Sequence, residues 1–459
     1  MSTIRPQQLV EHALATTRSE QCVVIVQDST SANLRWANNT LTTNGVMHGV
    51  GVTVIAFAGS GNASVSGTAA SLDQVTALVE QADAAAATAS PAEDKADLVA
   101  GGVAVDWDEP AAETSIEVYR DLAPDLGAAF DDAQGAGRIL YGFVNHEVTT
   151  TYLGSSTGLR LRHVQPTGHY GCTGKTADLT NSAWVGGATR DFADVSAERI
   201  AADVARRLSW GSRRVDLPAG RYDTVLPPTA VADLMIDAYW GAGARVAHEG
   251  QSVYSRPGGG TRIGEKMVSD AVTLFSDPWY AGLECAPFAM ASSSSNESSV
   301  YDNGLPLGRT PWIADGVLAA LVQTRHTATM TGQPTTPGID NLVLDVAGGS
   351  GDELDLVAGV EDGLLLTCLW YIREVDPQTL LLTGLTRDGV YRIENGEITG
   401  AVNNFRFNES PVDLLRRFTA ASATVPSFSR EWGDDYFSRT ATPALRIPDF
   451  NMSSVSQAL

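Results

Sequence analysis

The chain has 459 residues, more than one compact hydrophobic core usually holds, and this length predicts two domains. Hydrophobic residues make up 43% and charged residues 19% of it, which is typical of a folded globular protein and excludes wholesale disorder. The net charge of −23 repels phosphate backbones and anionic lipid headgroups, so neither direct nucleic-acid binding nor membrane binding is expected.

The N-terminal segment lacks the basic stretch and apolar core of a signal peptide. No later segment reaches the roughly 18 apolar residues that span a bilayer. We therefore expect a cytoplasmic protein. The cysteines are scattered without CxxC spacing, which predicts reduced, buried thiols with packing roles. They are Cys22, Cys172, Cys285 and Cys368.

The first predicted elements are helices and strands in alternation. Residues 5–19 have the spacing of a helix, and residues 21–27 form an apolar run typical of a buried strand. Two strand-like runs, residues 33–42 and 49–58, flank the turn-forming sequence Thr-Asn-Gly, which predicts an antiparallel hairpin. A Ser-x-x-Gln start predicts a further helix over residues 71–86.

A long loop and a domain boundary are predicted next. Residues 83–113 are rich in Ala, Pro, Asp and Glu with little periodicity, which predicts the end of a helix followed by a long surface loop over about 87–113. A helix, three strands and a second, amphipathic helix follow, over residues 115–133, 139–144, 147–153, 159–164 and 196–209. The turn-rich sequence at 217–223 predicts a boundary between an N-terminal domain, 1–216, and a C-terminal domain, 217–459.

The C-terminal half is richer in strands. Residues 390–394 and 397–402 flank Asn395-Gly396, the preferred centre of a type I′ turn, and therefore predict a hairpin. A helix over 411–421 and a short strand over 444–447 complete the chain. Helices and antiparallel hairpins are interspersed without βαβ regularity. This predicts an α+β fold, with hairpins and helices in the N-terminal domain and a strand-rich antiparallel C-terminal domain.

His248-Glu249 is the first candidate for chemistry. In an HExxH helix, two histidines on one face bind zinc and the glutamate activates water. Here Ser252 stands at the fourth position after His248, and Val253 stands at the fifth. A hydrocarbon side chain cannot ligate a metal, so neither HExxH nor HExxxH is completed. Taken alone, the pair is more often structural than functional.

Ser156 is the second candidate, because residues 154–158 match the GxSxG pattern of serine hydrolases. A nucleophile elbow needs a strand before the serine and a helix after it. The residues that follow, 159–164, alternate like a strand, so the pattern favours a hairpin turn. His163 and His169 nevertheless keep a serine-hydrolase hypothesis open.

Short motifs of the second half, taken in order, resemble the TldD/PmbA family of metalloproteases, whose members carry a historic label as modulators of DNA gyrase. Their order and spacing make the combined resemblance specific over most of residues 218–448. The N-terminal 215 residues resemble the family more loosely, through a hairpin followed by a helix. The motifs are GRYDTVL at 220–226, a stretch ending in TLFSDP at 264–278, YDNGLP at 301–306, IADGVL at 313–318 and IENGEI at 393–398.

The resemblance implies a two-domain α+β subunit that pairs with a related subunit around a cavity in which unfolded peptides are cut. Catalytic members are expected to carry HExxxH and a cysteine near the C-terminus as zinc ligands. Here Val253 replaces the second histidine, and no cysteine follows Cys368, which leaves residues 430–438 where the late ligand would be sought. This pattern is similar to that of the family's non-catalytic subunits, called TldE or PmbA.

The resemblance therefore implies the zinc-free subunit of a cytosolic metalloprotease, with unfolded peptides as substrates. We expect no catalytic residue, no metal site and no cofactor in this chain, where His248 and Glu249 would be a degenerate remnant. Zinc is expected in a TldD-like partner. The alternatives are a metallopeptidase with unconventional ligands and a serine hydrolase using Ser156. A DNA-associated regulator is suggested only by the gyrase label, and the acidic charge argues against it.

Overall fold

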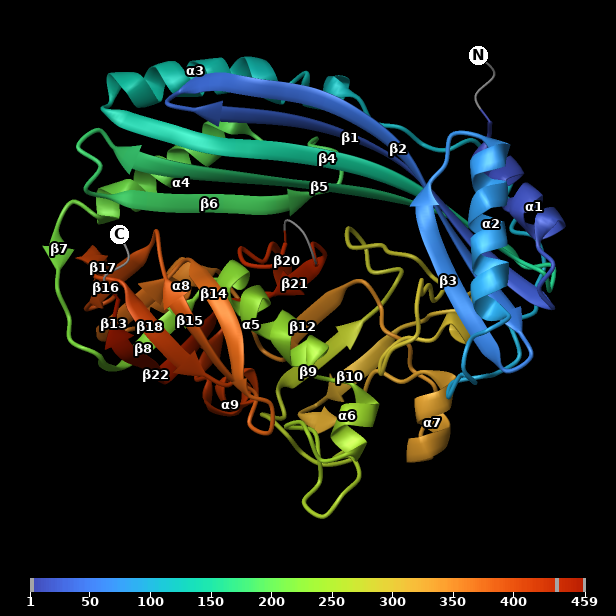
Figure 1. The fold of residues 1–459 in the computed structure, drawn as a ribbon. Helices are drawn as coiled ribbons and strands as arrows, with labels where there is room; N and C mark the ends of the chain where they lie inside the picture. Colours follow the sequence, from blue (N-terminus) through green and yellow to red (C-terminus); the bar gives the residue numbers. More distant parts are fainter. Residues whose placement is uncertain (1–3, 434–436, 457–459) are drawn as a thin grey trace.

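The computed structural model describes residues 4–433 and 437–456. A long, curved sheet built from the first 189 residues lies above two sheets built from the rest of the chain (Figure 1). Helices and mostly antiparallel strands alternate without a doubly wound arrangement, which confirms the predicted α+β class.

The first sheet has six strands in the order β3-β2-β1-β4-β5-β6, and every neighbouring pair is antiparallel. Four of its strands are 17 to 19 residues long, which gives the sheet its extended shape in Figure 1. The strands are β1 (Gln21–Ala37), β2 (Thr40–Ala58), β3 (Gly61–Thr68), β4 (Arg138–Ser155), β5 (Arg160–Thr176) and β6 (Ser182–Thr189).

The turn of the first hairpin differs from the prediction. It lies at Asn38-Asn39, whose φ angles of 52° and 56° suit a type I′ turn. Residues 43–45, where the turn was predicted, are paired strand residues opposite 33–35 of β1. The prediction was wrong because an Asn-Gly pair inside a long paired strand has the same local signature as a turn.

The strands of this sheet are also more continuous than predicted. The runs 139–144 and 147–153 belong to the single strand β4, because Asn145 and His146 between them are paired with both β1 and β5. His146 is buried, and its ring bonds Thr114 and the carbonyl oxygen of Arg190. Partners from other elements therefore stabilise polar residues that, in the sequence, resemble a turn.

Four helices cover one face of the first sheet, in two groups. The helices α1 and α2 pack on β1 and β2, while α3 and α4 pack on the opposite end of the sheet. Ser71 and Ser196 cap α2 and α4 by accepting main-chain hydrogen bonds, as the predicted helix starts require. The bounds are α1 (Pro6–Thr16), α2 (Leu72–Ala86), η1 (Ile116–Tyr119), α3 (Leu122–Gly135) and α4 (Ala197–Trp210).

The ten-stranded sheet belongs to the second part of the chain. Its order is β14-β15-β18-β22-β8-β13-β16-β17-β7, with β19 paired to β22. The hairpin predicted at Asn395-Gly396 is confirmed, and these residues have φ angles of 52° and 79°. The strands are β7 (Arg214–Val215), β8 (Gly220–Leu226), β13 (Asp362–Leu366), β14 (Leu369–Asp376), β15 (Leu381–Thr386), β16 (Val390–Glu394), β17 (Glu397–Val402), β18 (Phe405–Glu409), β19 (Ala420–Ala421) and β22 (Leu445–Val455).

A second six-stranded sheet has the order β11-β10-β9-β12-β21-β20. Its strands are β9 (Val272–Ser276), β10 (Thr310–Ala314), β11 (Val317–Leu318), β12 (Leu342–Val346), β20 (Val425–Ser427) and β21 (Thr440–Thr442). The remaining helices are α5 (Pro228–Trp240), α6 (Ala244–His248), η2 (Val300–Asp302), α7 (Arg325–Thr331), α8 (Glu353–Ala358) and α9 (Pro411–Arg417).

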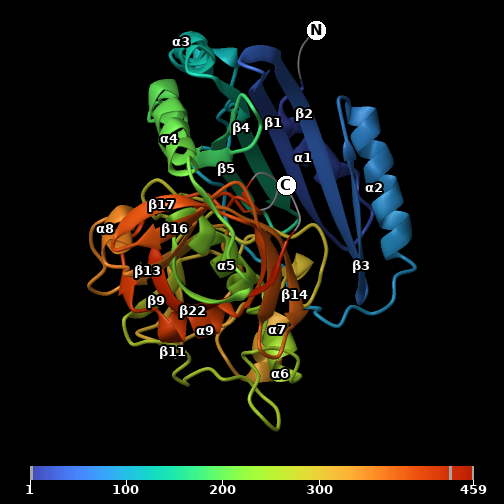
Figure 2. The same cartoon turned by 90° about the vertical axis from the view of Figure 1, so that its left-hand side faces the viewer.

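The main hydrophobic core forms around α5, which lies between the two later sheets (Figures 1 and 2). Nine residues of this helix are buried, including Leu234, Met235 and Ile236. A helix that is apolar on nearly every side is typical of a position inside the protein. Because it is enclosed, α5 fixes the position of any polar side chain that it carries.

The two parts of the chain meet along the other face of the first sheet. Val23 and Ile25 of β1 point away from the covering helices and pack with Phe288, Val300 and Tyr301. The change from the first sheet to the ten-stranded sheet falls between β6 and β7, and the domain boundary at 216/217 stays a prediction. In the part of the chain that the structure describes, no helix is long and apolar enough to cross a membrane.

Candidate functional site

The His248-Glu249 pair closes a helix instead of opening one. The helix α6 has five residues and ends at His248, and Glu249 is its C-cap. Gly250 follows with a φ angle of 82°, a left-handed conformation that ends the helix and that glycine adopts readily. A zinc-binding motif requires the second ligand to lie one helical turn after His248. Positions 252 and 253 do not lie on such a turn, because the helix has already ended.

Val253 packs in the main core, where its side chain is 9% exposed. The His248 side chain is half-buried and has no hydrogen-bond partner in the described part of the chain. Across residues 4–433 and 437–456, no group of three or more His, Cys, Asp or Glu side chains is placed to hold a metal ion. The residues of the degenerate motif thus do not fit a zinc ion.

Glu249 instead belongs to an ion-paired cluster between α6 and the loop at 87–113. The Arg245 guanidinium lies 3.1 Å from the Glu249 carboxylate and 3.0 Å from the Glu93 carboxylate. Hydrogen bonds from Arg245 lower the pKa of Glu93, and the Nε2 atom of His326 on α7 lies 3.5 Å from the same Glu93 carboxylate. Arg245 therefore joins α6 to the loop through Glu93, and the contact of Glu249 is with Arg245.

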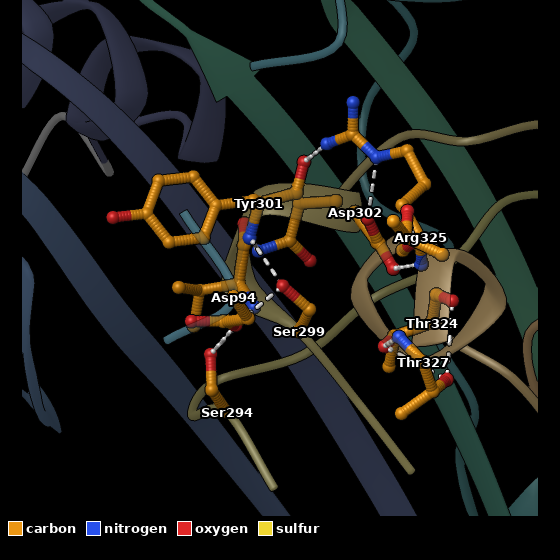
Figure 3. A network of polar contacts seen from close by, with 11 residues as sticks. Asp94, Ser294, Ser299, Tyr301, Asp302, Thr324, Arg325 and Thr327 are labelled. Atoms are coloured by element: carbon orange, nitrogen blue, oxygen red, sulfur yellow. Dashed lines mark hydrogen bonds and ion pairs between the residues drawn. The ribbon is translucent and has the colours of Figure 1, made fainter. Parts of the chain in front are cut away.

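Figure 3 shows a polar network that fixes the same loop. The Asp94 carboxylate accepts hydrogen bonds of 2.6 Å from the hydroxyl groups of Ser294 and Ser299. Next to it, Arg325 donates to the buried Asp302 carboxylate at 2.6 Å and to the carbonyl oxygen of Tyr301. The Asp94 contacts join the loop at 87–113 to residues about 200 positions later in the chain, and they hold the loop against the second part of the chain.

Ser156 lies in the turn between β4 and β5, with a strand on each side. Its hydroxyl oxygen accepts a hydrogen bond of 3.1 Å from the main-chain N–H of Cys22. The nearby histidines have other contacts, since His163 bonds Gln165 at 3.0 Å and His169 stacks on Phe428. Without a following helix or a histidine partner in the described residues, the GxSxG match favours a turn.

The segment Ser429–Trp432, in the C-terminal region where a late zinc ligand was sought, packs on α5 and not on α6. The Ser429 hydroxyl donates to Asp233 Oδ1 at 2.5 Å, and the Glu431 main-chain N–H donates to the same oxygen at 2.9 Å. Trp432 Nε1 lies 3.2 Å from Asp237 Oδ2. Residues 434–436 of the predicted region lie outside the described residues.

Burial determines the electrostatics of these two aspartates. Asp233 has an exposed fraction of 0%, and desolvation raises its pKa to about 8. Desolvation also raises the pKa of Asp237 to about 7 and that of the Glu431 carboxyl above its ordinary range. Asp233 is therefore mostly protonated at neutral pH. Its Oδ2 atom has no hydrogen-bond partner among the described residues.

Neither aspartate was singled out by the sequence analysis. The available signal was two carboxylates four residues apart in the otherwise apolar sequence PTAVADLMIDAYW. A spacing of four places both on one helix face, and so many apolar neighbours predict that this face is buried. Carboxyls with a pKa near neutrality are suited to proton transfer, but complete burial keeps Asp233 away from a substrate.

Two models of known protein families match parts of this chain. The family model described as PmbA/TldA metallopeptidase C-terminal domain matches residues 219–454, and that described as PmbA/TldA metallopeptidase domain 1 matches residues 22–86. No curated protein matches the sequence.

The similar solved structures include three that are each 16% identical in sequence to this chain, a likeness that shows the fold alone. TldE from Thermococcus kodakarensis has a TM-score of 0.75, with 97% of this chain and 99% of that chain covered. Two proteins described as putative modulators of DNA gyrase have comparable scores. The one from Thermotoga maritima has a TM-score of 0.77, covering 97% and 99%, and the one from Bacteroides thetaiotaomicron has 0.73, covering 98% of each chain.

The family model of the C-terminal domain spans more than half of the chain, and its bounds enclose the motifs that run from GRYDTVL to IENGEI. The chain therefore belongs to the PmbA/TldD metallopeptidase family.

Proposed function

We propose that this chain is the zinc-free, TldE-like subunit of a two-subunit cytoplasmic metalloprotease. The observation that carries the proposal is that the sequence around His248 does not form a zinc-binding helix. The helix α6 ends at His248, and the residue five positions later, Val253, is a core side chain. A metal site needs convergent ligands on a fixed scaffold, and residues 248–253 offer one histidine.

The proposed partner is a homologous subunit with an intact HExxxH motif and a late cysteine, which supplies the zinc and activates water. This chain would help to enclose unfolded peptides and to hold them in extended form. Strand addition is a suitable mode, because an edge strand such as β3 leaves one row of main-chain groups free for pairing. No direct contact with nucleic acid is proposed, since a charge of −23 repels a duplex.

Co-expression with the zinc-bearing homologue of the same organism tests the proposal. We expect a stoichiometric complex on size-exclusion chromatography, with zinc in the partner. Chelator-sensitive cleavage of an unfolded peptide should require that partner. His248→Ala in this chain should leave the zinc content and the cleavage rate of the complex unchanged, whereas removal of a partner histidine should abolish both.

Two results would overturn the proposal. One is about one zinc per chain in the isolated protein together with chelator-sensitive cleavage by this chain alone. The other is the recovery of monomers or homodimers only after co-expression. Metal-independent cleavage that is lost in Ser156→Ala would instead support the serine-hydrolase alternative.

A further inference from the structure

A cavity of about 900 Å³ lies between the first sheet and the ten-stranded sheet. Its walls come from β5, β6 and the end of α4 on one side, and from β14, β16, β17 and Arg430 on the other. The helix α4 lies beside β17 (Figure 2). A second space of about 500 Å³ shares Tyr141, Thr173, Trp370 and Arg430 with it. We call the larger space the inter-sheet cavity, and its volume is typical of a ligand site.

The charge of this lining is opposite to that of the whole chain. Five cationic and two acidic side chains, Asp216 and Asp388, line the cavity, although the chain carries a net charge of −23. Three of the cations already lie near a carboxylate, since Arg214 is 3.7 Å from Asp216, Arg387 is 3.4 Å from Asp388 and Arg207 is 3.8 Å from Glu353. Lys175 and Arg430 form no ion pair among the described residues. Cations gathered between low-dielectric walls attract an anion more strongly than the same cations on an open surface. The cationic residues are Lys175, Arg207, Arg214, Arg387 and Arg430.

The lining also holds buried polar atoms that have no partner in the described part of the protein. They are Nε of Arg207 and Arg430, Nε1 of Trp370 and the hydroxyl oxygen of Tyr391, whose side chain is 2% exposed. The three nitrogens are donors only. Buried donors without an acceptor are costly and rare. Because these atoms are enclosed by protein, they show that the wall of the cavity is short of acceptors, and the cationic groups that face the cavity are the ones that can contact a ligand.

Aromatic stacking fixes the orientation of Arg430. Its guanidinium lies 5.2 Å from the ring centroid of Trp184 and 4.1 Å from that of Trp370, so that it is positioned between the first sheet and β14. Arg387 lies 5.7 Å from the same Trp370 ring. Arg430 forms no ion pair within residues 4–433 and 437–456. A stacked guanidinium keeps its N–H edge available for bidentate bonds to a planar carboxylate.

We propose that the inter-sheet cavity binds a carboxylate of a peptide, with Arg430 as the principal contact and with Arg207 and Arg387 beside it. This inference rests on the proposed role in handling peptides and names the chemical group that the chain recognises. Every linear peptide supplies one such group at its C-terminus, and aspartate or glutamate side chains supply others. The binding is reversible and involves no covalent step.

Isothermal titration calorimetry on the isolated full-length chain tests the inference with three acetylated Gly-Ser hexapeptides. One ends in a free carboxylate, one ends in an amide, and one ends in an amide with a single glutamate at the centre. The free carboxylate should bind at least about ten-fold more tightly than the neutral amide, and added salt should weaken its binding. Tight binding of the glutamate peptide as well would identify any carboxylate, and not only the C-terminus, as the recognised group.

Variants locate the binding site. Arg430→Met should weaken binding of the carboxylate peptide about ten- to hundred-fold, the range expected for lost bonds to a charged group. Tyr391→Phe keeps the ring and removes only the hydroxyl, so it should weaken binding less. Arg18→Met is the matched control, because Arg18 is exposed, does not line the cavity and should leave affinity unchanged.

Equal affinity for the acid and amide peptides would overturn the inference, as would equal affinity of Arg430→Met and Arg18→Met. If Arg430→Met does not fold, Arg387→Met and Tyr391→Phe replace it, since neither removes the contact between Trp184 and Arg430. Weaker binding of the carboxylate peptide by Arg387→Met than by Arg18→Met supports the inference. Affinities equal to that of Arg18→Met in both variants overturn it. Failure here is distinguishable from failure of the proposed function. Complex formation with lost carboxylate selectivity refutes only the inference, whereas selectivity without complex formation refutes only the two-subunit proposal.

Discussion

Replacement of Asp233 by asparagine is expected to change how stability depends on pH. The Asp233 side chain is completely buried on α5, where Oδ1 accepts hydrogen bonds from Ser429 and from the Glu431 main chain. Asparagine preserves that acceptor and places an amide nitrogen at Oδ2, an atom without a hydrogen-bond partner among the described residues. The variant therefore preserves the shape and the two hydrogen bonds to Oδ1 while it removes the titration. Its amide nitrogen lacks an acceptor, and this cost does not change with pH, so it lowers the stability without altering the slope.

The magnitude follows from proton linkage. In the unfolded chain the carboxyl loses its proton near pH 3.8, whereas burial raises the pKa of the folded state to about 8. Between these values the folded state binds one more proton, so its stabilisation is complete below pH 3.8 and is lost as pH rises towards 8. The free energy of unfolding then falls by about 1.4 kcal/mol per pH unit for one group. Asp237, with a pKa of about 7, adds a similar dependence up to that pH.

Urea unfolding followed by tryptophan fluorescence at pH 5, 6, 7 and 8 measures this effect. Between pH 5 and 8, Asp233→Asn should lose roughly 2 to 4 kcal/mol less stability than the wild type. Asp131→Asn serves as the control, since Asp131 is exposed on α3, and it should follow the wild-type curve. If Asp233→Asn and the wild type have the same slope, the buried carboxyl does not titrate as described and the reasoning is refuted.

Three further variants test individual contacts. Val253→His should bind no zinc and should lower the free energy of unfolding by about 1 to 3 kcal/mol, because it buries an imidazole without a partner; metal analysis and urea unfolding measure both, and about one zinc per chain would contradict it. Ser156→Ala removes one hydrogen bond to Cys22, so it should cost about 1 kcal/mol or less and leave any peptide cleavage unchanged, whereas lost cleavage would restore the serine hypothesis. Asp94→Ala removes two serine hydrogen bonds and should speed limited proteolysis of the loop at 87–113, whereas Asp97→Ala, which removes an exposed carboxylate of the same loop, should not; equal rates would show that the Asp94 network does not hold the loop.

Local chemistry determined much of the fold from sequence alone. The Asn395-Gly396 turn and the caps at Ser71 and Ser196 were predictable because a type I′ turn and a helix start each depend on a few adjacent residues. Residues 154–158 were likewise assigned to a hairpin turn because strand-like alternation follows them. The order of short motifs in the second half was sufficient to identify the family.

Only the tertiary structure decided the rest, because the deciding interactions join residues that are far apart in the sequence. Partners on both sides keep Asn145 and His146 within β4, and hydrogen bonds from Ser429 and Glu431 fix Asp233, about 200 positions earlier in the chain. The sequence by itself determined that Val253 cannot complete a zinc motif. The structure added that residues 249–253 do not continue the helix that a zinc motif requires, because α6 ends before Gly250 and Val253 is enclosed in the core.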